Sequence, residues 1–110
     1  MDDVYVGNSL LNLYTSTGNM DLCGKVFDEM PLRDVVSWTT MISGFKEFGG
    51  FDDSFIALER MRSEGVMPNQ VTVVNALASC AGLGDLDMGV WIHEYVKING
   101  WELDVSWALR

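Results

Sequence analysis

Residues 35–69 read VVSWTTMISGFKEFGGFDDSFIALERMRSEGVMPN, and this stretch decides the fold. Its first half has the three-to-four spacing of one helical stripe, which comprises Trp38, Met41, Ile42, Phe45 and Phe48. The glycines at 49–50 should end that helix, and we expect Asp52 or Asp53 to cap a second one. The second stripe comprises Phe51, Phe55, Leu58 and Met61. Gly65 suits the left-handed residue after a helix and Pro68 blocks its continuation, so the stretch predicts two helices joined by a turn.

The same plan recurs along the chain at fixed offsets. Gly18, Gly49 and Gly84 are separated by 31 and then 35 residues. Three further columns share both offsets: Asp21, Asp52 and Asp87; Met30, Met61 and Val96; and Leu11, Ile42 and Leu77. Four columns with one pair of offsets indicate an internal repeat. The repeat predicts units at residues 4–34, 35–69 and 70–104, with residues 1–3 ending a preceding unit and residues 105–110 beginning a further one.

The two outer units carry stripes like those of the middle unit. In residues 4–34 a turn at 17–19 separates two stripes, which comprise Val6, Leu10, Leu13 and Tyr14, then Cys23, Phe27 and Met30. In residues 70–104 a turn at 82–85 separates Val73, Leu77 and Cys80 from Leu86, Val90, Ile92 and Val96. One such helix pair cannot cover its own apolar faces, so units must stack. The sequence therefore predicts an all-α fold, a right-handed α-solenoid of helix-turn-helix repeats, and we expect it to be a fragment of a longer array.

Composition limits the possible functions. Seven basic against sixteen acidic residues give a net charge of −9, which argues against tight non-specific binding of nucleic acid, since that affinity comes largely from Lys and Arg. Cys23 and Cys80 lack a CxxC partner, and we expect buried free thiols. No apolar run approaches the roughly 18 residues of a membrane span. The start, Met-Asp-Asp-Val, lacks the basic character of a targeting peptide, so any such segment is expected outside this sequence.

The three units resemble a known family. Residues 35–45, VVSWTTMISGF, running on to Met61 and closing with GVMPN at 65–69, resemble a pentatricopeptide repeat. Residues 4–34, with GNSLL at 7–11 and KVFDEMP at 25–31, resemble its short variant. Residues 70–104, with VTVV at 71–74 and WIHEYV at 91–96, resemble its long variant. Mixed lengths are typical of the plant subclass that alternates standard, long and short repeats (the PLS subclass), whereas the constant 34-residue period of the tetratricopeptide repeat is absent.

The resemblance implies binding of single-stranded RNA in mitochondria or chloroplasts, with about one base read per repeat by two or three side chains. It also implies a role in RNA modification, such as C-to-U RNA editing, or in other processing of organellar transcripts. Each first helix should present a small polar residue beside the last residue of the unit. The base-reading residues are then Asn8 with Asp34, which resemble pairs preferring uridine, and Thr39 with Asn69, which resemble pairs preferring adenosine.

The third unit departs from this pattern. Val74 holds the reading position and offers no hydrogen bond to a base, so with Asp104 it should discriminate weakly or act as a spacer. The residues expected to pack against bases are Tyr5, Val36 and Val71. Each polar assignment has a structural alternative, since Asn8 could serve a helix N-terminus, Thr39 could be an ordinary surface residue, and Asp34 and Asn69 could be turn residues.

A protein-protein interaction scaffold and an enzyme are the two alternative classes of function. Similar solenoids often act as protein-protein interaction scaffolds, which the acidic charge would suit. An enzyme is not predicted, because base deamination needs His-x-Glu and Pro-Cys-x-x-Cys around zinc and neither motif is present. His93 beside Glu94 has no second His or Cys one helical turn away, so we expect no metal site and no cofactor. The expected partners are an organellar single-stranded RNA and other editing or processing proteins, but no membrane.

Overall fold

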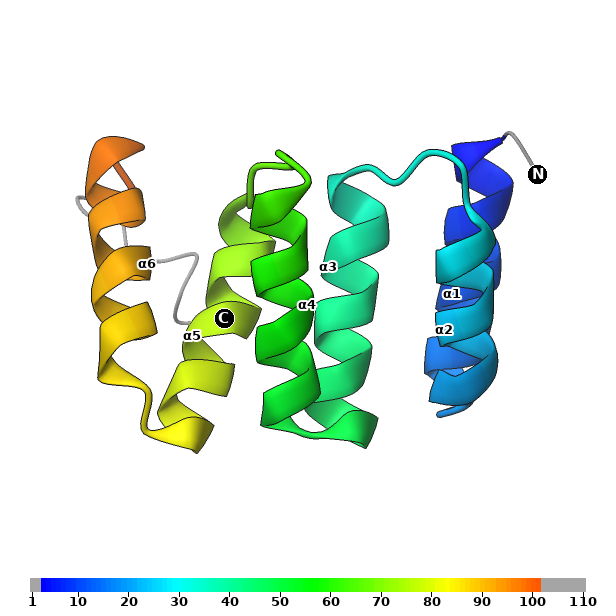
Figure 1. Cartoon of the computed structure of the whole chain (residues 1–110), viewed down its shortest axis with the longest axis horizontal. Helices are drawn as coiled ribbons and strands as arrows, with labels where there is room; N and C mark the ends of the chain where they lie inside the picture. Colours follow the sequence, from blue (N-terminus) through cyan, green and yellow to red (C-terminus); the bar gives the residue numbers. More distant parts are fainter. Residues whose placement is uncertain (1–2, 102–110) are drawn as a thin grey trace.

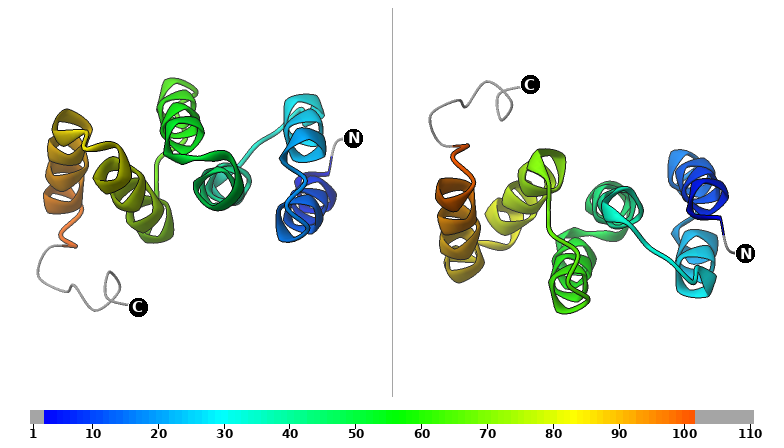
Figure 2. Two further views of the ribbon diagram at one scale, coloured as in Figure 1. Left: turned by 90° about the horizontal axis from the view of Figure 1, so that it is seen from below. Right: turned by 90° about the horizontal axis from the view of Figure 1, so that it is seen from above.

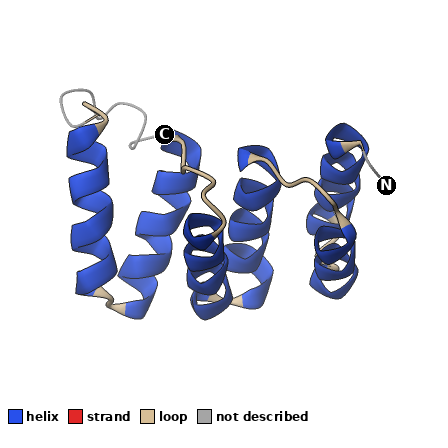
Figure 3. Cartoon of the chain, turned by 45° about the horizontal axis from the view of Figure 1, so that its top comes forward, coloured by secondary structure: helices blue, strands red, loops and turns tan. Residues whose placement is uncertain are grey.

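The computed structural model describes residues 3–101, and over this range the chain is helical without a strand (Figures 1 and 3). The helices are α1 (Val4–Ser16), α2 (Met20–Glu29), α3 (Val35–Gly44), the π-helical turn η1 (Phe45–Gly49), α4 (Phe51–Ser63), α5 (Gln70–Leu83) and α6 (Leu86–Ile98). They stand side by side along the 39 Å long axis (Figure 1). The predicted α-solenoid of stacked helix pairs is confirmed.

The helices form two layers, seen end-on in Figure 2. We call α1, α3 and α5 the A layer and α2, α4 and α6 the B layer. In the A layer α1 packs on α3 and α3 packs on α5, whereas neither α2 with α4 nor α4 with α6 makes comparable contacts. The A helices are therefore the more closely spaced, as expected for the inner side of a curved stack.

Side-chain caps explain where most helices begin. Five helices start behind an Asp or Asn whose side chain accepts a backbone N–H of the first turn; these caps are Asp3, Asn19, Asp34, Asn69 and Asp85. The exception is α4, where the prediction that Asp52 or Asp53 is the cap was wrong. That helix begins at Phe51 behind Gly50, which has a φ of +113° and makes no side-chain bond. Both aspartates instead lie in its first turn, where their negative charges interact favourably with the positive end of the helix dipole.

The core is centred on Trp38, which is fully buried between the two layers. Phe27 meets the Trp38 ring edge-on at 4.6 Å between centroids, and the Arg60 guanidinium lies 5.4 Å from the same ring. Ile42 and Met61 are also fully buried. Cys23 and Cys80 are buried free thiols, as predicted, and burial raises the pKa of Cys23 to about 11. The core thus joins the A and B layers through large side chains from α2, α3 and α4.

Several residues of the predicted stripes are exposed instead: Val6, Leu13, Phe48, Phe51, Leu77, Leu86 and Val90. In the first unit Leu11 is the fully buried leucine of α1. Val6 and Leu13 lie 31 residues before Ser37 and Gly44, which are buried against the preceding helix pair. The two apolar residues therefore lie on the side of α1 where no earlier helix of the described stack packs.

Similar reasons account for the other exposed residues. Leu77 lies 35 residues after the fully buried Ile42, but no helix follows α5 and α6 in the described stack to cover it. Leu86 and Val90 lie on α6, the last helix of that stack. Phe48 lies in η1, where the extra residue of a π turn shifts the helical register and moves it off the stripe. Phe51 is the first residue of α4 and is 38% exposed.

Two glycines within helices test the packing of α3 on α1. A Cβ on Gly44 would lie 2.7 Å from Thr15 Cγ2, whereas a Cβ on Gly24 in α2 would have no neighbour within 4 Å. We predict that Gly24→Ala raises the free energy of unfolding by about 0.5–1 kcal/mol, because alanine loses less entropy in a helix. Gly44→Ala should lower it, because α1 and α3 must separate. Urea denaturation measures the free energy of unfolding of both variants. Equal changes in the two would contradict this packing of α3 on α1.

Candidate functional site

Charge separates the two layers. The helices α1, α3 and α5 contain no Asp, Glu, Lys or Arg, and the A layer gains charge only in η1, at Lys46 and Glu47. Within residues 3–101 the remaining charges lie on the B helices, in the connectors or at caps. Lys25 lies on α2, and Arg62 lies on α4 with its guanidinium 3.6 Å from the Trp91 ring. The A layer therefore offers an uncharged face, a separation that the sequence analysis did not predict.

A groove of about 320 Å³ runs along this face across all three units. Asn12 of α1, Thr39 and Ser43 of α3, and Asn75 of α5 contribute amides and hydroxyls to its lining. Among residues 3–101, Glu47 is the only charged residue that lines it. The groove can therefore donate and accept hydrogen bonds but provides no cationic site for phosphates. Acidic residues do not crowd it either, so its charge alone does not favour a basic protein partner.

Asn8 and Asp34 lie together at the boundary between the first and second units. The Asn8 Nδ2 group donates to Asp34 Oδ1 at 3.1 Å, although 26 residues separate them. Ser37 completes the cluster, because its hydroxyl donates to Asn8 Oδ1 and lies 3.0 Å from Asp34 Oδ1. Asp34 is the N-cap of α3 and accepts the Ser37 backbone N–H at 3.0 Å. The two residues predicted to act as a pair are therefore in direct contact.

The second unit repeats this arrangement with different residues. The Thr39 and Thr72 hydroxyl oxygens lie 2.7 Å apart across the boundary between α3 and α5. Thr72 in turn lies 2.8 Å from Asn69 Oδ1, which also accepts the Thr72 backbone N–H at 2.9 Å. Asn69 is the N-cap of α5. Thr39 and Asn69 are thus joined through a hydroxyl rather than directly, and the two clusters lie one unit apart.

These contacts bear on the structural alternatives. Asn8 does not cap its own helix, because Asp3 caps α1 and Asn8 lies in its second turn; its amide instead contacts the capping box of α3. Asp34 and Asn69 do have a structural role, since each caps the helix that follows. In the first cluster Asp34 Oδ1 both caps α3 and accepts from Asn8, and in the second Asn69 Oδ1 caps α5 and lies near the Thr72 hydroxyl. The sequence analysis missed Ser37 and Thr72, whose position three residues after an Asp or Asn is the signal of a capping box.

Exposed apolar side chains accompany the polar clusters. Tyr5, Val36 and Val71 are 78%, 51% and 58% exposed and lie three residues before Asn8, Thr39 and Val74, respectively. Val71 lines the groove, where a flat apolar partner could cover it. Val74 is half-buried and has no polar atom to present. Its expected partner Asp104 lies outside the described residues.

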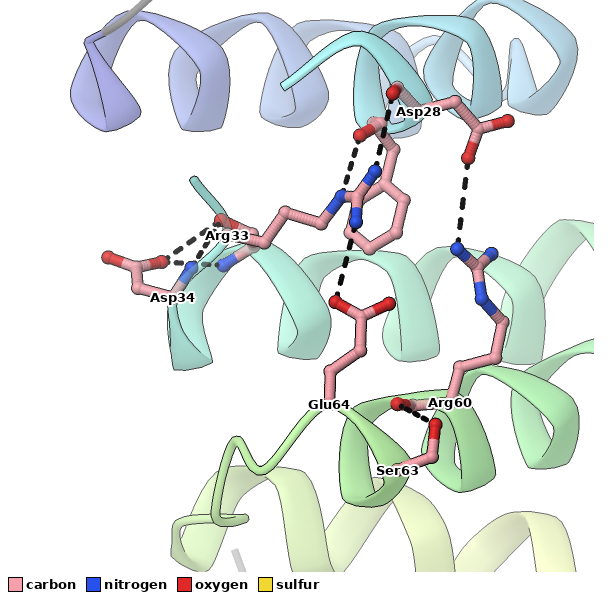
Figure 4. Close-up of polar contacts among 8 residues, drawn as sticks. Asp28, Arg33, Asp34, Arg60, Ser63 and Glu64 are labelled. Carbon is pink, nitrogen blue, oxygen red and sulfur yellow. Dashed lines mark hydrogen bonds and ion pairs between the residues drawn. The ribbon is translucent and has the colours of Figure 1, made fainter. Parts of the chain in front are cut away.

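Arg33 fixes the connector that presents Asp34. Its guanidinium donates to the carbonyls of Phe27 and Asp28 at the end of α2, where a helix leaves carbonyls without partners (Figure 4). The same group pairs with Glu64 at 3.4 Å, while the nearby Arg60 pairs loosely with Asp28 at 3.9 Å (Figure 4). Arg33 therefore ties α2 to the end of α4, and the next residue, Asp34, starts α3 from a fixed position.

The surroundings of Asp34 shift its ionisation. Burial raises the pKa of the carboxyl, but hydrogen bonds from the Ser37 backbone, the Asn8 amide, the Ser37 hydroxyl and the Val36 backbone lower it, and the net pKa lies below its ordinary value of 3.8. Asp34 is consequently ionised at neutral pH. An ionised carboxylate offers a ligand acceptors only.

Together the two layers and the clusters between units define a helical-repeat protein whose A face carries polar groups at a regular spacing. A profile of the PPR repeat matches residues 8–35 and 36–66. The chain belongs to the pentatricopeptide repeat family. Within residues 3–101 no helix has the length and apolar character required to cross a membrane.

Plant proteins of this family are similar over most of the chain. A mitochondrial pentatricopeptide repeat-containing protein of Arabidopsis thaliana is 41% identical over 92% of the chain, and another, named as chloroplastic/mitochondrial, is 46% identical over 86%. A chloroplastic one is 35% identical over 81%. The chain spans 15% of the length of the first two relatives and 12% of the third.

The ionisation of Asp34 gives a pH prediction. Its pKa is lower in the folded chain than in the unfolded chain, so ionised Asp34 stabilises the fold above about pH 4, and this stability is lost as the pH falls through the folded pKa. Asp34→Asn keeps a capping side chain, as Asn69 does in the next unit, but cannot titrate. The excess stability of the wild type over this variant should shrink as the pH falls from about 5 to about 2. Urea denaturation at several pH values measures this, and a constant difference would contradict it.

Proposed function

We propose that the A face binds single-stranded RNA and that the clusters at the unit boundaries read one base each. The observation that carries the proposal is the contact of Asn8 with Asp34 and its counterpart, the Thr39–Thr72–Asn69 chain, one unit further on. Both clusters are polar and lie beside an exposed apolar residue that can stack on a base. Hydrogen bonds to the Watson–Crick edge of an unstacked base require such an arrangement.

The caps give the two clusters opposite polarity. Asp34 is ionised and can only accept hydrogen bonds, which suits the ring N–H of uracil or guanine. Asn69 uses Oδ1 to cap α5, so its NH₂ end is left to donate, which suits the unprotonated ring nitrogen of adenine or cytosine. The first cluster therefore favours bases with a keto group, and the second favours bases with an amino group.

The neighbouring reading residue adds to each preference. Asn8 has a second amide N–H that can donate to the uracil O4, while the Thr39 oxygen can accept from the amino group of adenine. Thr39 is also shorter than Asn8, which leaves more room for a purine. We therefore propose uridine at the first cluster and adenosine at the second, with Val74 and Asp104 contributing little discrimination in the third unit.

The wider role proposed for this protein follows from its relatives. The chain's mixed unit lengths fit the PLS subclass, and we propose that it acts within a longer array in mitochondria or chloroplasts, the locations in the relatives' names. There it would select a transcript for C-to-U editing or another processing step. The catalytic step would be carried out by another domain or protein, because a zinc deaminase needs a His-x-Glu motif with Pro-Cys-x-x-Cys and this sequence has neither.

A scaffold for protein partners is the second candidate function. The observation that favours it is the net charge of −9, to which the B helices contribute −4 and the cap residues Asp3, Asp34 and Asp85 a further −3. Such a surface would attract a basic protein partner and would leave the A face unused. This candidate predicts that RNA sequence has no effect on binding.

The test of base reading exchanges the second cluster for the first. Thr39→Asn combined with Asn69→Asp reproduces the Asn8–Asp34 chemistry one unit on, and Asp is itself a good helix cap. We expect a short RNA carrying U then A to bind the wild type better than U-C or C-C. The double variant should prefer U-U over U-A by about tenfold, since a good base contact discriminates by about 1–3 kcal/mol.

Chemical-shift titration suits this test, because we expect two reading clusters beside a groove whose described lining has no Lys or Arg to bind weakly. Asn69→Asp alone is the matched control: it reverses the polarity of the cap but keeps Thr39 short, so it should weaken adenosine binding without creating full uridine preference. Equal affinity for all these RNAs, in the wild type and in both variants, would eliminate base reading and leave the scaffold as the better account.

A further inference from the structure

We propose that Ser37 and Thr72 are positioning residues for base reading, each setting the geometry of the cluster that reads for the preceding unit. The inference rests on the proposed RNA-binding function and extends it, because it makes each reading site the joint product of two consecutive units. Neither residue was singled out by the sequence analysis.

Ser37 is fully buried and connects every polar group of the first cluster. Its hydroxyl oxygen lies 3.0 Å from Asp34 Oδ1 and accepts the Asp34 backbone N–H at 3.2 Å, and the hydroxyl also donates to Asn8 Oδ1. A side chain that only completed a capping box would need the contacts with Asp34 alone. The contact with Asn8 crosses to another helix and reaches the reading residue itself.

Thr72 holds the same place 35 residues later and is also fully buried. Its oxygen accepts the Asn69 backbone N–H at 3.3 Å and lies 2.8 Å from Asn69 Oδ1. It also lies 2.7 Å from the Thr39 hydroxyl on the neighbouring helix. Two units with different reading residues therefore share one device, a buried hydroxyl between the cap and the reader.

The hydroxyl proton decides which atoms each reader presents. A bond from Ser37 to Asn8 Oδ1 holds the amide with its oxygen toward Ser37, so the NH₂ group faces Asp34. The Thr39 hydroxyl donates to the Val35 carbonyl at 2.6 Å. Its contact with the Thr72 hydroxyl then fixes the direction of the lone pair that the Thr39 oxygen has left. Without the buried hydroxyl, Asn8 could turn over and Thr39 would lose its second anchor.

A capping role and a positioning role predict different results. Loss of a cap destabilises the whole fold and lowers every RNA affinity by the same factor, because only folded protein binds. Loss of positioning changes the base preference of one cluster and leaves the other unchanged. The ratio of affinities for two RNAs that differ at a single base therefore separates the two roles.

The experiment uses four single variants of the chain. Ser37→Ala and Thr72→Val each remove a hydroxyl. Ser37→Thr and Thr72→Ser keep a hydroxyl, because each places in one unit the residue found in the other. Affinities are measured by chemical-shift titration for short RNAs carrying U-A, C-A and U-C. We expect Ser37→Ala to reduce the preference for U over C at the first base by about fivefold, the worth of one hydrogen bond, and to leave the second base unaffected. Thr72→Val should do the reverse at the second base.

Ser37→Thr and Thr72→Ser should keep the wild-type ratios of affinity for the three RNAs. If Ser37→Ala and Thr72→Val lower all affinities while leaving both ratios as in the wild type, the positioning role is overturned and only the capping role remains. If the wild type itself shows no preference among the three RNAs, base reading fails, and the inference fails with it. A loss of base preference at one position only, absent from the variant that keeps a hydroxyl there, supports both base reading and the positioning role.

Discussion

The hydrogen bond that an Asp or Asn side-chain oxygen accepts from a backbone N–H in the first turn of the next A helix is the constraint on which this structure depends. Asp34 and Asn69 each start a helix, and each also ends a unit, so one residue sets both the geometry of the stack and the polar group at the boundary. Capping takes an oxygen, which leaves Asp34 with further acceptors and Asn69 with donors. The proposed base preferences follow from this division.

The separation of charge determines how such a protein would bind its ligand. With Glu47 as the only charged residue of the described chain that lines the groove, release of counterions from phosphates would supply little of the affinity for the proposed RNA. Stacking on exposed residues such as Val71 and hydrogen bonds to base edges must supply it instead. Each unit then contributes a small increment, and an array of many units would add the increments while keeping selectivity. Under the proposed function, the acidic B layer would reduce attraction to nucleic acid of the wrong sequence.

Helical spacing, glycine positions and the sequence offsets predicted the helices, the turns at Gly18 and Gly65, and the burial of Trp38 and Met61, because these features follow from the local sequence of each unit. Features that depend on neighbours were not predictable. Periodicity marks Val6 and Leu77 as stripe residues, but it cannot tell that no further helix of the described stack covers them. The π turn that moves Phe48 off its stripe has no signal in the pattern of apolar residues.

The candidate site shows the same limit. The resemblance to pentatricopeptide repeats singled out Asn8, Asp34, Thr39 and Asn69, and their roles as base readers remain predictions. Ser37 and Thr72 were visible as Ser and Thr three residues after a cap, but their contacts with the preceding helix depend on how α1, α3 and α5 pack. The structure adds those contacts and the uncharged A face, neither of which can be read from one unit alone.

The most direct test of the account is a map of where RNA contacts the chain. Nitrogen-15 spectra of the protein with and without a short RNA carrying U then A should show the side-chain amide signals of Asn8 and Asn69 moving most, with α2 and α4 nearly unchanged. Shifts confined to the B helices, with both amide signals still, would contradict the claim that the cap residues form the reading sites.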